Sequence, residues 1–189
     1  MPVCVELCAG MGGMALGLAQ AGYTHALLVE RDARAAATLE ANGFGPVLVQ
    51  DAAEVDFTPY RGVDLVAGGV PCQPFSHGGL ARGHEDERNL FEHAVRAVRE
   101  CEPAAFLFEN VAGLLRPAFA PYLESVTRRL GRLGYTVSTH LVDAADFGLP
   151  QRRKRCLLIG TRGNYAPPSP CGQFRTVRDL FRELGPPRA

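Results

Sequence analysis

Short apolar runs alternate with segments of helical periodicity along most of this chain, and that alternation limits the folds available to it. Apolar runs at residues 3–7, 26–30, 47–50, 63–67 and 104–108 are expected to be strands. Helices are expected at residues 14–21, 33–42, 90–100 and 119–133. Strands that alternate with helices are typical of parallel sheets, so the sequence predicts an α/β protein with a doubly wound, mostly parallel sheet.

Two more strands are expected at residues 135–142 and 155–160, which brings the sheet to about seven strands. No helix separates these two, so they are expected to form an antiparallel pair at one edge. Residues 1–163 are expected to form one domain, and residues 164–189 a proline-rich linker with a short helix from Thr176 to Leu184. Thr176 would cap that helix.

The composition is typical of a globular protein and does not exclude a nucleic-acid partner. Its 189 residues suit a single core, and a net charge of zero gives no global attraction to nucleic acid or membrane. Lys154 is the only lysine, and arginine, which supplies nearly all the positive charge, suits contacts to phosphates and bases.

The six cysteines do not form a CxxC pair, so no metal site is expected. Cys4, Cys101 and Cys156 lie in apolar runs and are expected to be small core residues. Reduced cysteines predict a cytoplasmic protein. No apolar run is long enough to span a membrane, so no membrane partner is expected.

Three consecutive strands end in groups that suit a nucleotide cofactor. Gly10, Gly12 and Gly13 lie between the first strand and the first helix, where a backbone can approach a ligand closely. Glu30 ends the second strand and could accept hydrogen bonds from a ribose, and Asp51 ends the third and could accept from an adenine amino group. The alternative is an ordinary turn with two solvated loop acids.

A second group of residues suits covalent chemistry. Cys72 follows the fourth strand in a loop framed by glycine and proline, and Glu109 follows the fifth strand. Adjacent strands lie about 5 Å apart, so the thiol and the carboxyl would flank one small ligand. The apolar neighbours Phe106, Leu107 and Phe108 would partly desolvate the carboxyl, which favours its protonated form. The alternatives are an inert cysteine and a solvated acid.

These residues occur in blocks that resemble those of the DNA cytosine (carbon-5) methyltransferases, in the order typical of that family. The blocks are Glu6 to Gly13, Pro71 to Ser76, His77 to Phe91, Glu109 to Val111 and Gln151 to Arg155. The resemblance covers nearly the whole chain and implies a Rossmann-like fold that binds S-adenosylmethionine and releases S-adenosylhomocysteine. The cofactor-binding residues that it implies are Cys8, Ala9, Gly10, Met11, Gly12, Gly13, Glu30, Arg31, Asp51, Ala52, Pro71 and Leu90.

The resemblance also implies a mechanism on cytosine in DNA. Cys72 would add to carbon 6 of the ring, which makes carbon 5 nucleophilic enough to take the methyl group. Glu109 would stabilise the adduct at ring nitrogen 3, and Arg153 and Arg155 would hold the base and a phosphate. The target base would have to be flipped out of the duplex. The residues implied to contact substrate are Gln73, Ser76, Asn110 and Gln151.

Three departures from the family pattern stand out. Cys8 replaces a usual phenylalanine beside the cofactor, and Arg31 replaces a usual hydrophobic residue. Residues 176–180 resemble the segment that precedes the family's target-recognition domain, and the sequence ends at Ala189. The resemblance therefore implies a chain without the recognition domain and the closing C-terminal motif.

Three functions fit this pattern. The chain is expected to be the catalytic subunit of a split or minimal DNA methyltransferase, of the kind found in restriction–modification systems, with a second polypeptide supplying recognition. One alternative is a stand-alone enzyme for a free cytosine nucleoside or nucleotide, which would need no recognition domain. The other is a relic that binds cofactor without catalysis.

Overall fold

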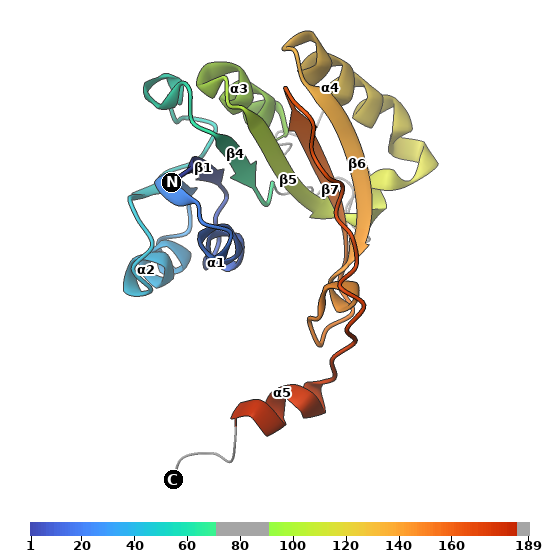
Figure 1. The fold of residues 1–189 in the computed structure, drawn as a ribbon. Coiled ribbons are helices and arrows are strands. Elements are labelled where there is room, and N and C mark those ends of the chain that lie inside the picture. The colour runs from blue at the N-terminus through green and yellow to red at the C-terminus, as the bar shows by residue number, and fades with distance from the viewer. Residues whose placement is uncertain (71–90, 185–189) are drawn as a thin grey trace.

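A seven-stranded sheet in the order β3-β2-β1-β4-β5-β7-β6 forms the centre of the molecule (Figure 1). The structure is a computed structural model, and it describes residues 1–70 and 91–184. The strands are β1 (Val3–Leu7), β2 (Thr24–Glu30), β3 (Val47–Val49), β4 (Leu65–Gly68), β5 (Ala105–Val111), β6 (Thr136–Asp143) and β7 (Lys154–Thr161). The predicted mostly parallel sheet is confirmed, since β1 to β5 pair in parallel.

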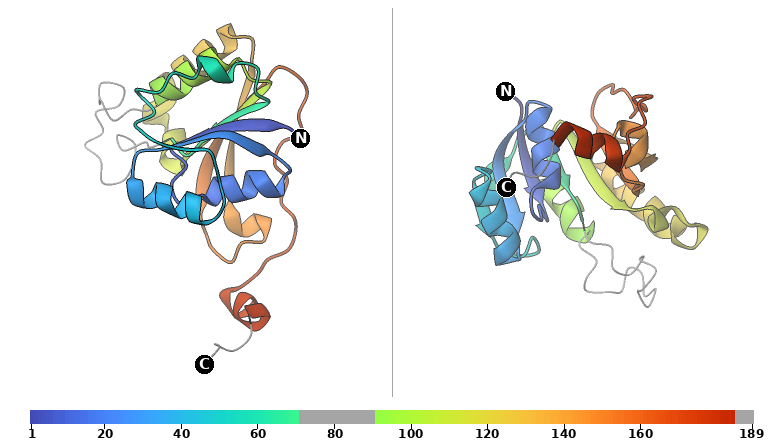
Figure 2. Two further views of the ribbon diagram at one scale, coloured as in Figure 1. Left: turned by 90° about the vertical axis from the view of Figure 1, so that its left-hand side faces the viewer. Right: turned by 90° about the horizontal axis from the view of Figure 1, so that it is seen from below.

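Helices cover both faces of the sheet (Figure 2). α1 (Gly13–Gln20) and α2 (Ala33–Ala41) pack on one face, and α3 (Phe91–Cys101) and α4 (Ala120–Arg132) on the other. Short 3₁₀ turns are η1 (Thr58–Tyr60), η4 (Ala112–Leu115), η5 (Pro117–Phe119) and η6 (Ala144–Phe147). The structure therefore has the helix–sheet–helix layers that the alternating sequence predicts.

Of the seven strands in the described residues, β7 alone runs against the others. β6 and β7 form the predicted antiparallel pair, but β7 also pairs antiparallel with β5 and so lies between β5 and β6. β6 therefore runs in the same direction as β1 to β5. Because β7 alone is reversed, its first residues lie at the edge of the sheet where the parallel strands end.

The main core lies between the sheet and the face that carries α3 and α4. Phe106 and Phe108 of β5 stack with ring centroids 5.3 Å apart, and both are fully buried. The Tyr135 ring packs edge-on against Phe106, and its hydroxyl donates to the Pro103 carbonyl at 2.7 Å. Cys4, Cys101 and Cys156 are fully buried, as predicted.

The C-terminal segment leads away from the sheet to α5 (Val177–Leu184), which lies apart from the other helices (Figure 1). Thr176 caps this helix as predicted, since the Asp179 amide donates to its hydroxyl at 3.3 Å and Asp179 accepts from its amide at 2.8 Å. Val177 and Phe181 are 52% and 63% exposed. Within the described residues, no helix is long and apolar enough to cross a membrane.

Gly160 provides a test of the β5–β7 pairing, because it lies opposite Phe106 in the antiparallel register. A Cβ at Gly160 would lie 2.1 Å from the Phe106 ring. We expect Gly160→Ala to lower the free energy of unfolding by about 1–3 kcal/mol through overpacking, measured by urea denaturation. Gly163→Ala, where a Cβ would meet open space, is the control and should change little. Equal stability of the two variants would contradict this packing.

Candidate functional site

The polar residues predicted to form a site meet at the edge of the sheet where β1, β2, β4 and β5 end and β7 begins. The strand ends lie side by side because these four strands pair in parallel. This is the edge at which open α/β sheets bind ligands. The predicted residues Pro71, Cys72, Gln73, Ser76 and Leu90 lie outside the described residues.

The loop after β1 turns sharply into α1. Gly10 and Gly12 both have positive φ angles, and so does Cys8, at 54°. At Gly12 a Cβ would lie 2.8 Å from the Leu39 side chain, so both space and backbone conformation require glycine there. No side chain of the described residues caps the start of α1, which leaves its first N–H groups available to a ligand.

Glu30 holds this loop in place. One carboxylate oxygen accepts from the Gly10 amide at 2.8 Å, and the other accepts from the Asp32 amide at 2.9 Å. The sequence predicts a ribose-binding role for Glu30, and the structure adds a structural one. Each carboxylate oxygen has a second lone pair, so both roles are compatible.

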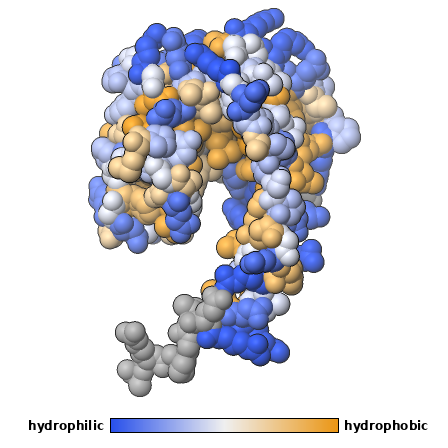
Figure 3. Space-filling view, viewed as in Figure 1, coloured by the Kyte–Doolittle hydropathy of each residue, from blue (hydrophilic) through white to orange (hydrophobic). Residues whose placement is uncertain are grey.

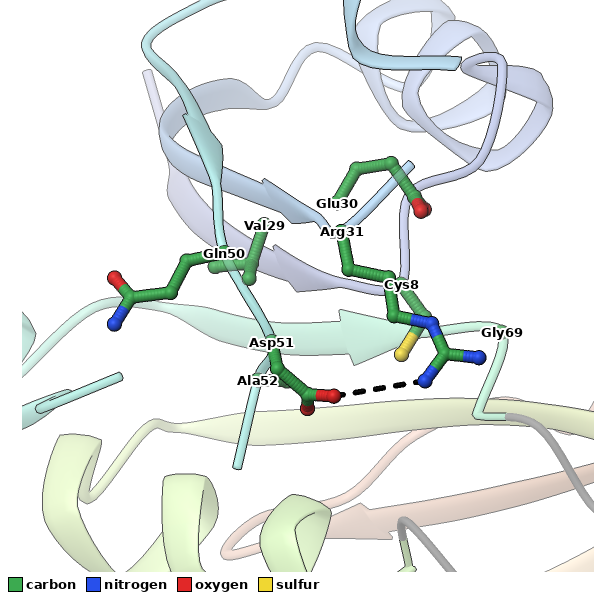
Figure 4. A pocket seen from close by; sticks show the side chains of 8 residues that line it. All are labelled: Cys8, Val29, Glu30, Arg31, Gln50, Asp51, Ala52 and Gly69. Atoms are coloured by element: carbon green, nitrogen blue, oxygen red, sulfur yellow. Dashed lines mark ion pairs between the residues drawn. The ribbon is translucent and has the colours of Figure 1, made fainter. Parts of the chain in front are cut away.

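A first cavity of about 130 Å³ opens between the ends of β1, β2, β3 and β4 (Figure 4). It is lined by Cys8, Val29, Glu30, Arg31, Gln50, Asp51, Ala52 and Gly69. Arg31 and Asp51 point toward each other in Figure 4, with 3.5 Å between nitrogen and oxygen. The structure thus brings together five residues predicted to bind cofactor: Cys8, Glu30, Arg31, Asp51 and Ala52.

A second cavity of about 490 Å³ adjoins the first, because Cys8 and Gly69 line both. Its other lining residues are Glu6, Ala9, Gly13, Met14, Glu109, Leu149, Gln151 and Arg153. It therefore connects the glycine loop with the predicted catalytic acid. Figure 3 shows the molecule hollowed between the α1 and α2 side and the β6 and β7 side, with apolar surface inside the hollow.

Glu109 is paired with both predicted arginines. Its Oε1 accepts from Arg155 Nε at 2.5 Å and lies 3.4 Å from an Arg153 nitrogen. Glu109 pairs with Leu157 in the register of β5 and β7, and side chains two residues apart share a face, so Arg155 and Arg153 lie on its side. Its Oε2 faces Gly69, since a Cβ built there would lie 3.8 Å away.

The surroundings of Glu109 correct one expectation. Phe106, Leu107 and Phe108 were expected to desolvate this carboxyl in part. The alternation of β5 turns Phe106 and Phe108 to the opposite face of the sheet and leaves Leu107 on the face of Glu109. Two guanidinium groups surround the carboxyl instead, and its side chain is 25% exposed. Charge pairing therefore dominates its environment.

Asn110, for which substrate contact stays a prediction, has a structural role. It is 3% exposed and lies on the face opposite to Glu109. Its side-chain amide donates to the Val70 carbonyl at 3.1 Å, and its oxygen accepts from the Val111 amide at 2.8 Å. Asn110 thus holds the backbone that leads toward residue 72.

The other predicted residues line the second cavity or lie just outside it. Gln151 and Arg153 line the second cavity, as does Ala9 of the glycine loop. Met11 is 73% exposed at the tip of that loop, beyond the residues that line the two cavities. No cluster of three or more potential metal ligands occurs in residues 1–70 and 91–184.

Four described cysteines are poor nucleophiles. Burial raises the pKa of Cys4, Cys8 and Cys101 to about 12 and that of Cys156 to about 11. The negative charges of Glu30 and Asp51 add to the effect at Cys8. A thiol attacks only as the thiolate, so Cys8 is unsuited to that role although it lines both cavities.

Two acids near the site were not among the predicted residues. Asp143 is 8% exposed and accepts from the Arg153 amide at 2.8 Å, a bond that lowers its pKa. Glu6 of β1 is fully buried, and its Oε2 lies 3.1 Å from His25 Nε2. Its Oε1 has no hydrogen-bond partner in the described part of the chain, although Glu6 lines the second cavity. The clue in the sequence was an acid inside an apolar strand.

The sheet order, the glycine loop and the acids after β2 and β3 define the Rossmann-like methyltransferase class of α/β proteins. The model of the C-5 cytosine-specific DNA methylase family matches residues 3–181, and the chain belongs to this family. The resemblance seen in the motifs is thereby confirmed. S-adenosylmethionine, the predicted cofactor, is the methyl donor of this family.

Known relatives support the assignment. The type II methyltransferase M.NaeI of Lentzea aerocolonigenes is 43% identical over 188 residues, which cover 95% of this chain and 46% of the relative. M.NgoMIV of Neisseria gonorrhoeae is 40% identical over 186 residues, covering 95% and 60%. The chain therefore spans about half the length of these curated relatives.

Solved structures show the same fold. A protein described as a DNA modification methyltransferase encoded within an E. coli prophage superposes with a TM-score of 0.80 at 26% identity, covering 95% of this chain and 54% of that one. A mutant of Spodoptera frugiperda DNMT2 superposes with a TM-score of 0.71 at 20% identity, covering 93% and 55%. At that identity the second match supports the fold alone.

The buried Glu6 predicts a pH dependence of stability. Burial raises its pKa above the ordinary value of 4.5, so above that pH the folded chain retains a proton that the unfolded chain has released. Stability should therefore fall as the pH rises through the interval above 4.5. Glu6→Gln cannot ionise, and we expect it to be more stable than wild type by about 1 kcal/mol near pH 7, with the difference vanishing near pH 4.

Urea denaturation across that pH range measures the effect. Glu40→Gln, which removes an exposed acid on α2, is the matched control and should show no such trend. Repeating the profile in a His25→Gln background removes the imidazole partner and isolates the contribution of the Glu6 carboxyl. A Glu6→Gln variant less stable than wild type at every pH would contradict the prediction.

Proposed function

We propose that this chain is the catalytic half of a DNA (cytosine-5) methyltransferase and that target recognition comes from a further polypeptide. The observation that carries the proposal is Glu109 held by Arg155 and Arg153 beside a cavity that reaches the glycine loop. The relatives named above are type II methyltransferases, which supports DNA as the substrate.

The residues present fit S-adenosylmethionine. The uncapped start of α1 suits its carboxylate, and Glu30, Asp51 and Ala52 line a cavity that suits its adenosine. Glu6 Oε1 is a fully buried acceptor that has no partner among residues 1–70 and 91–184, and it suits the cofactor's ammonium group. When bound, the cofactor supplies an electrophilic methyl group.

The chain's own residues would act on the cytosine. Cys72 would attack carbon 6 as the thiolate, and Glu109 would hold ring nitrogen 3. Arg155 orients the Glu109 carboxyl through the 2.5 Å contact, and the half-exposed Arg153 is available to a phosphate or the base. Asn110 would support Cys72 indirectly, by holding the Val70 carbonyl.

The C-terminal segment fits a link to the recognition part. Residues 164–189 are proposed to be a linker with a short helix, separate from a catalytic domain formed by residues 1–163. α5 stands away from the sheet in Figure 1, and Val177 and Phe181 expose apolar side chains that a further domain would cover.

The proposal is tested by labelling. The chain is incubated with methyl-labelled cofactor and either duplex DNA or free cytidine nucleotides, with and without a polypeptide from a neighbouring gene that encodes a recognition domain. We expect label in DNA cytosine at carbon 5. Cys72→Ser should abolish transfer yet retain S-adenosylhomocysteine binding, because the sulfur is the attacking atom. Cys171→Ser, which changes an exposed cysteine, is the control.

Each alternative has its own outcome. Labelled nucleotide formed by the chain alone would contradict the DNA assignment and favour a small-molecule enzyme. Cofactor binding without transfer to any substrate, whatever polypeptide is added, would favour a non-catalytic relic. Full transfer by Cys72→Ser would exclude the covalent mechanism.

The role assigned to Glu6 predicts a specific loss of affinity. We expect Glu6→Gln to bind S-adenosylhomocysteine about tenfold more weakly than wild type, since hydrogen bonds to charged groups contribute strongly. A second ligand is the analogue of S-adenosylhomocysteine that lacks the amino group of its amino-acid part. We expect Glu6→Gln and wild type to bind this analogue with similar affinity, measured by titration calorimetry. Equal weakening for both ligands would contradict a contact between Glu6 and the ammonium group.

A further inference from the structure

The loop between β3 and η1 carries two predicted cofactor residues but has little regular structure of its own. Within the loop, the Ala53 amide donates to Asp51 Oδ1 at 2.9 Å and the Glu54 amide to the Asp51 carbonyl at 3.0 Å. The Arg31–Asp51 pair is solvent-exposed at 3.5 Å and so contributes little. Asp51 and Ala52 therefore need an anchor from elsewhere in the fold.

Arg96 on α3 supplies that anchor through hydrogen bonds to the loop backbone. Its Nη2 donates to the carbonyls of Ala52 and Ala53 at 2.8 and 3.1 Å, and its Nη1 donates to the Val55 carbonyl at 2.7 Å. The guanidinium also lies 5.5 Å from the centre of the Phe57 ring. One side chain thus contacts four residues of this loop.

Glu100, one helical turn after Arg96, completes the arrangement. Its two carboxylate oxygens accept from Arg96 Nη1 at 3.0 and 3.1 Å, and one of them also accepts from the Phe57 amide at 3.0 Å. The two side chains are 23% and 17% exposed, so the pair is only weakly screened by solvent. The guanidinium is therefore held from its own helix while it holds the loop.

The two ends of the loop are anchored differently. At the far end, Val55 is 4% exposed and Phe57 is fully buried in the main core. At the near end, Ala52 is also 4% exposed in this core, but its methyl side chain makes a smaller apolar contact than the side chains of Val55 and Phe57. The Arg96 contacts hold the carbonyl groups of Ala52 and Ala53. Loss of Arg96 should therefore let Ala52 and its neighbour Asp51 move while the far end keeps the loop attached.

We propose that Arg96 is the positioning residue for the adenosine end of the cofactor cavity. By holding the carbonyl groups of Ala52, Ala53 and Val55 toward α3, it fixes where Asp51 and Ala52 face the ligand. The planar fork of arginine reaches three carbonyl groups at once, which a lysine ammonium cannot do in the same geometry. This inference rests on the proposed function, because it takes S-adenosylmethionine as the ligand.

Binding measurements on Arg96→Lys and Arg96→Gln test the proposal. Two ligands are compared by calorimetry: S-adenosylhomocysteine and its analogue in which a carbonyl oxygen replaces the adenine amino group. Wild type should prefer the adenine ligand. We expect both variants to lose about tenfold in affinity for S-adenosylhomocysteine and less for the analogue, so that selectivity shrinks, because small displacements weaken directed contacts strongly.

Arg99→Gln is the matched control, because Arg99 is an exposed arginine on the same helix, and it should keep wild-type affinity and selectivity. Circular dichroism and thermal unfolding check that each variant is folded, and Arg96→Lys serves if Arg96→Gln does not fold. Wild-type selectivity in both Arg96 variants, or equal loss for the two ligands, would overturn the proposal. A wild-type protein that binds neither ligand would instead contradict the proposed function.

Discussion

The reversal of β7 is the constraint on which the site depends. A parallel strand in that position would place its first residues at the opposite edge of the sheet, far from Glu109. Because β7 runs against β5, Arg153 and Arg155 arrive where the parallel strands end, and the alternation of side chains places them on the face of Glu109. The paired acid and guanidinium groups therefore follow from topology.

Most of the polar side chains around this pair form hydrogen bonds to backbone groups of the neighbouring loops. Glu30 fixes the glycine loop, Asn110 the Val70 carbonyl, Asp143 the Arg153 amide, and Arg96 the turn after Asp51. Loops at the edge of a sheet have few backbone partners, so buried side chains must satisfy them. Glu6 differs, since one of its oxygens is buried beside the cavity and has no partner within the described part of the chain, as expected of a group that binds a ligand.

The sequence pattern predicted the helices and strands better than it predicted the directions of their side chains. The period of the apolar residues and the glycines between them identified the strands, the four main helices and the cofactor loop. It misplaced the neighbours of Glu109, because Phe106 and Phe108 are adjacent along the chain but lie on the other face of β5. The same alternation gives Asn110 its structural role, and the sequence did not single out Arg96, because the loop carbonyl groups that it contacts are more than forty residues away along the chain.

The sequence by itself determined the fold class, the family and the residue types at the strand ends, because apolar periodicity and motif order are local properties of the chain. Only the tertiary structure decided that β7 inserts between β5 and β6, that two cavities meet at Cys8 and Gly69, and that Arg96 supports the loop of Asp51. Those features depend on strand pairing and on contacts between distant segments, which no local pattern encodes.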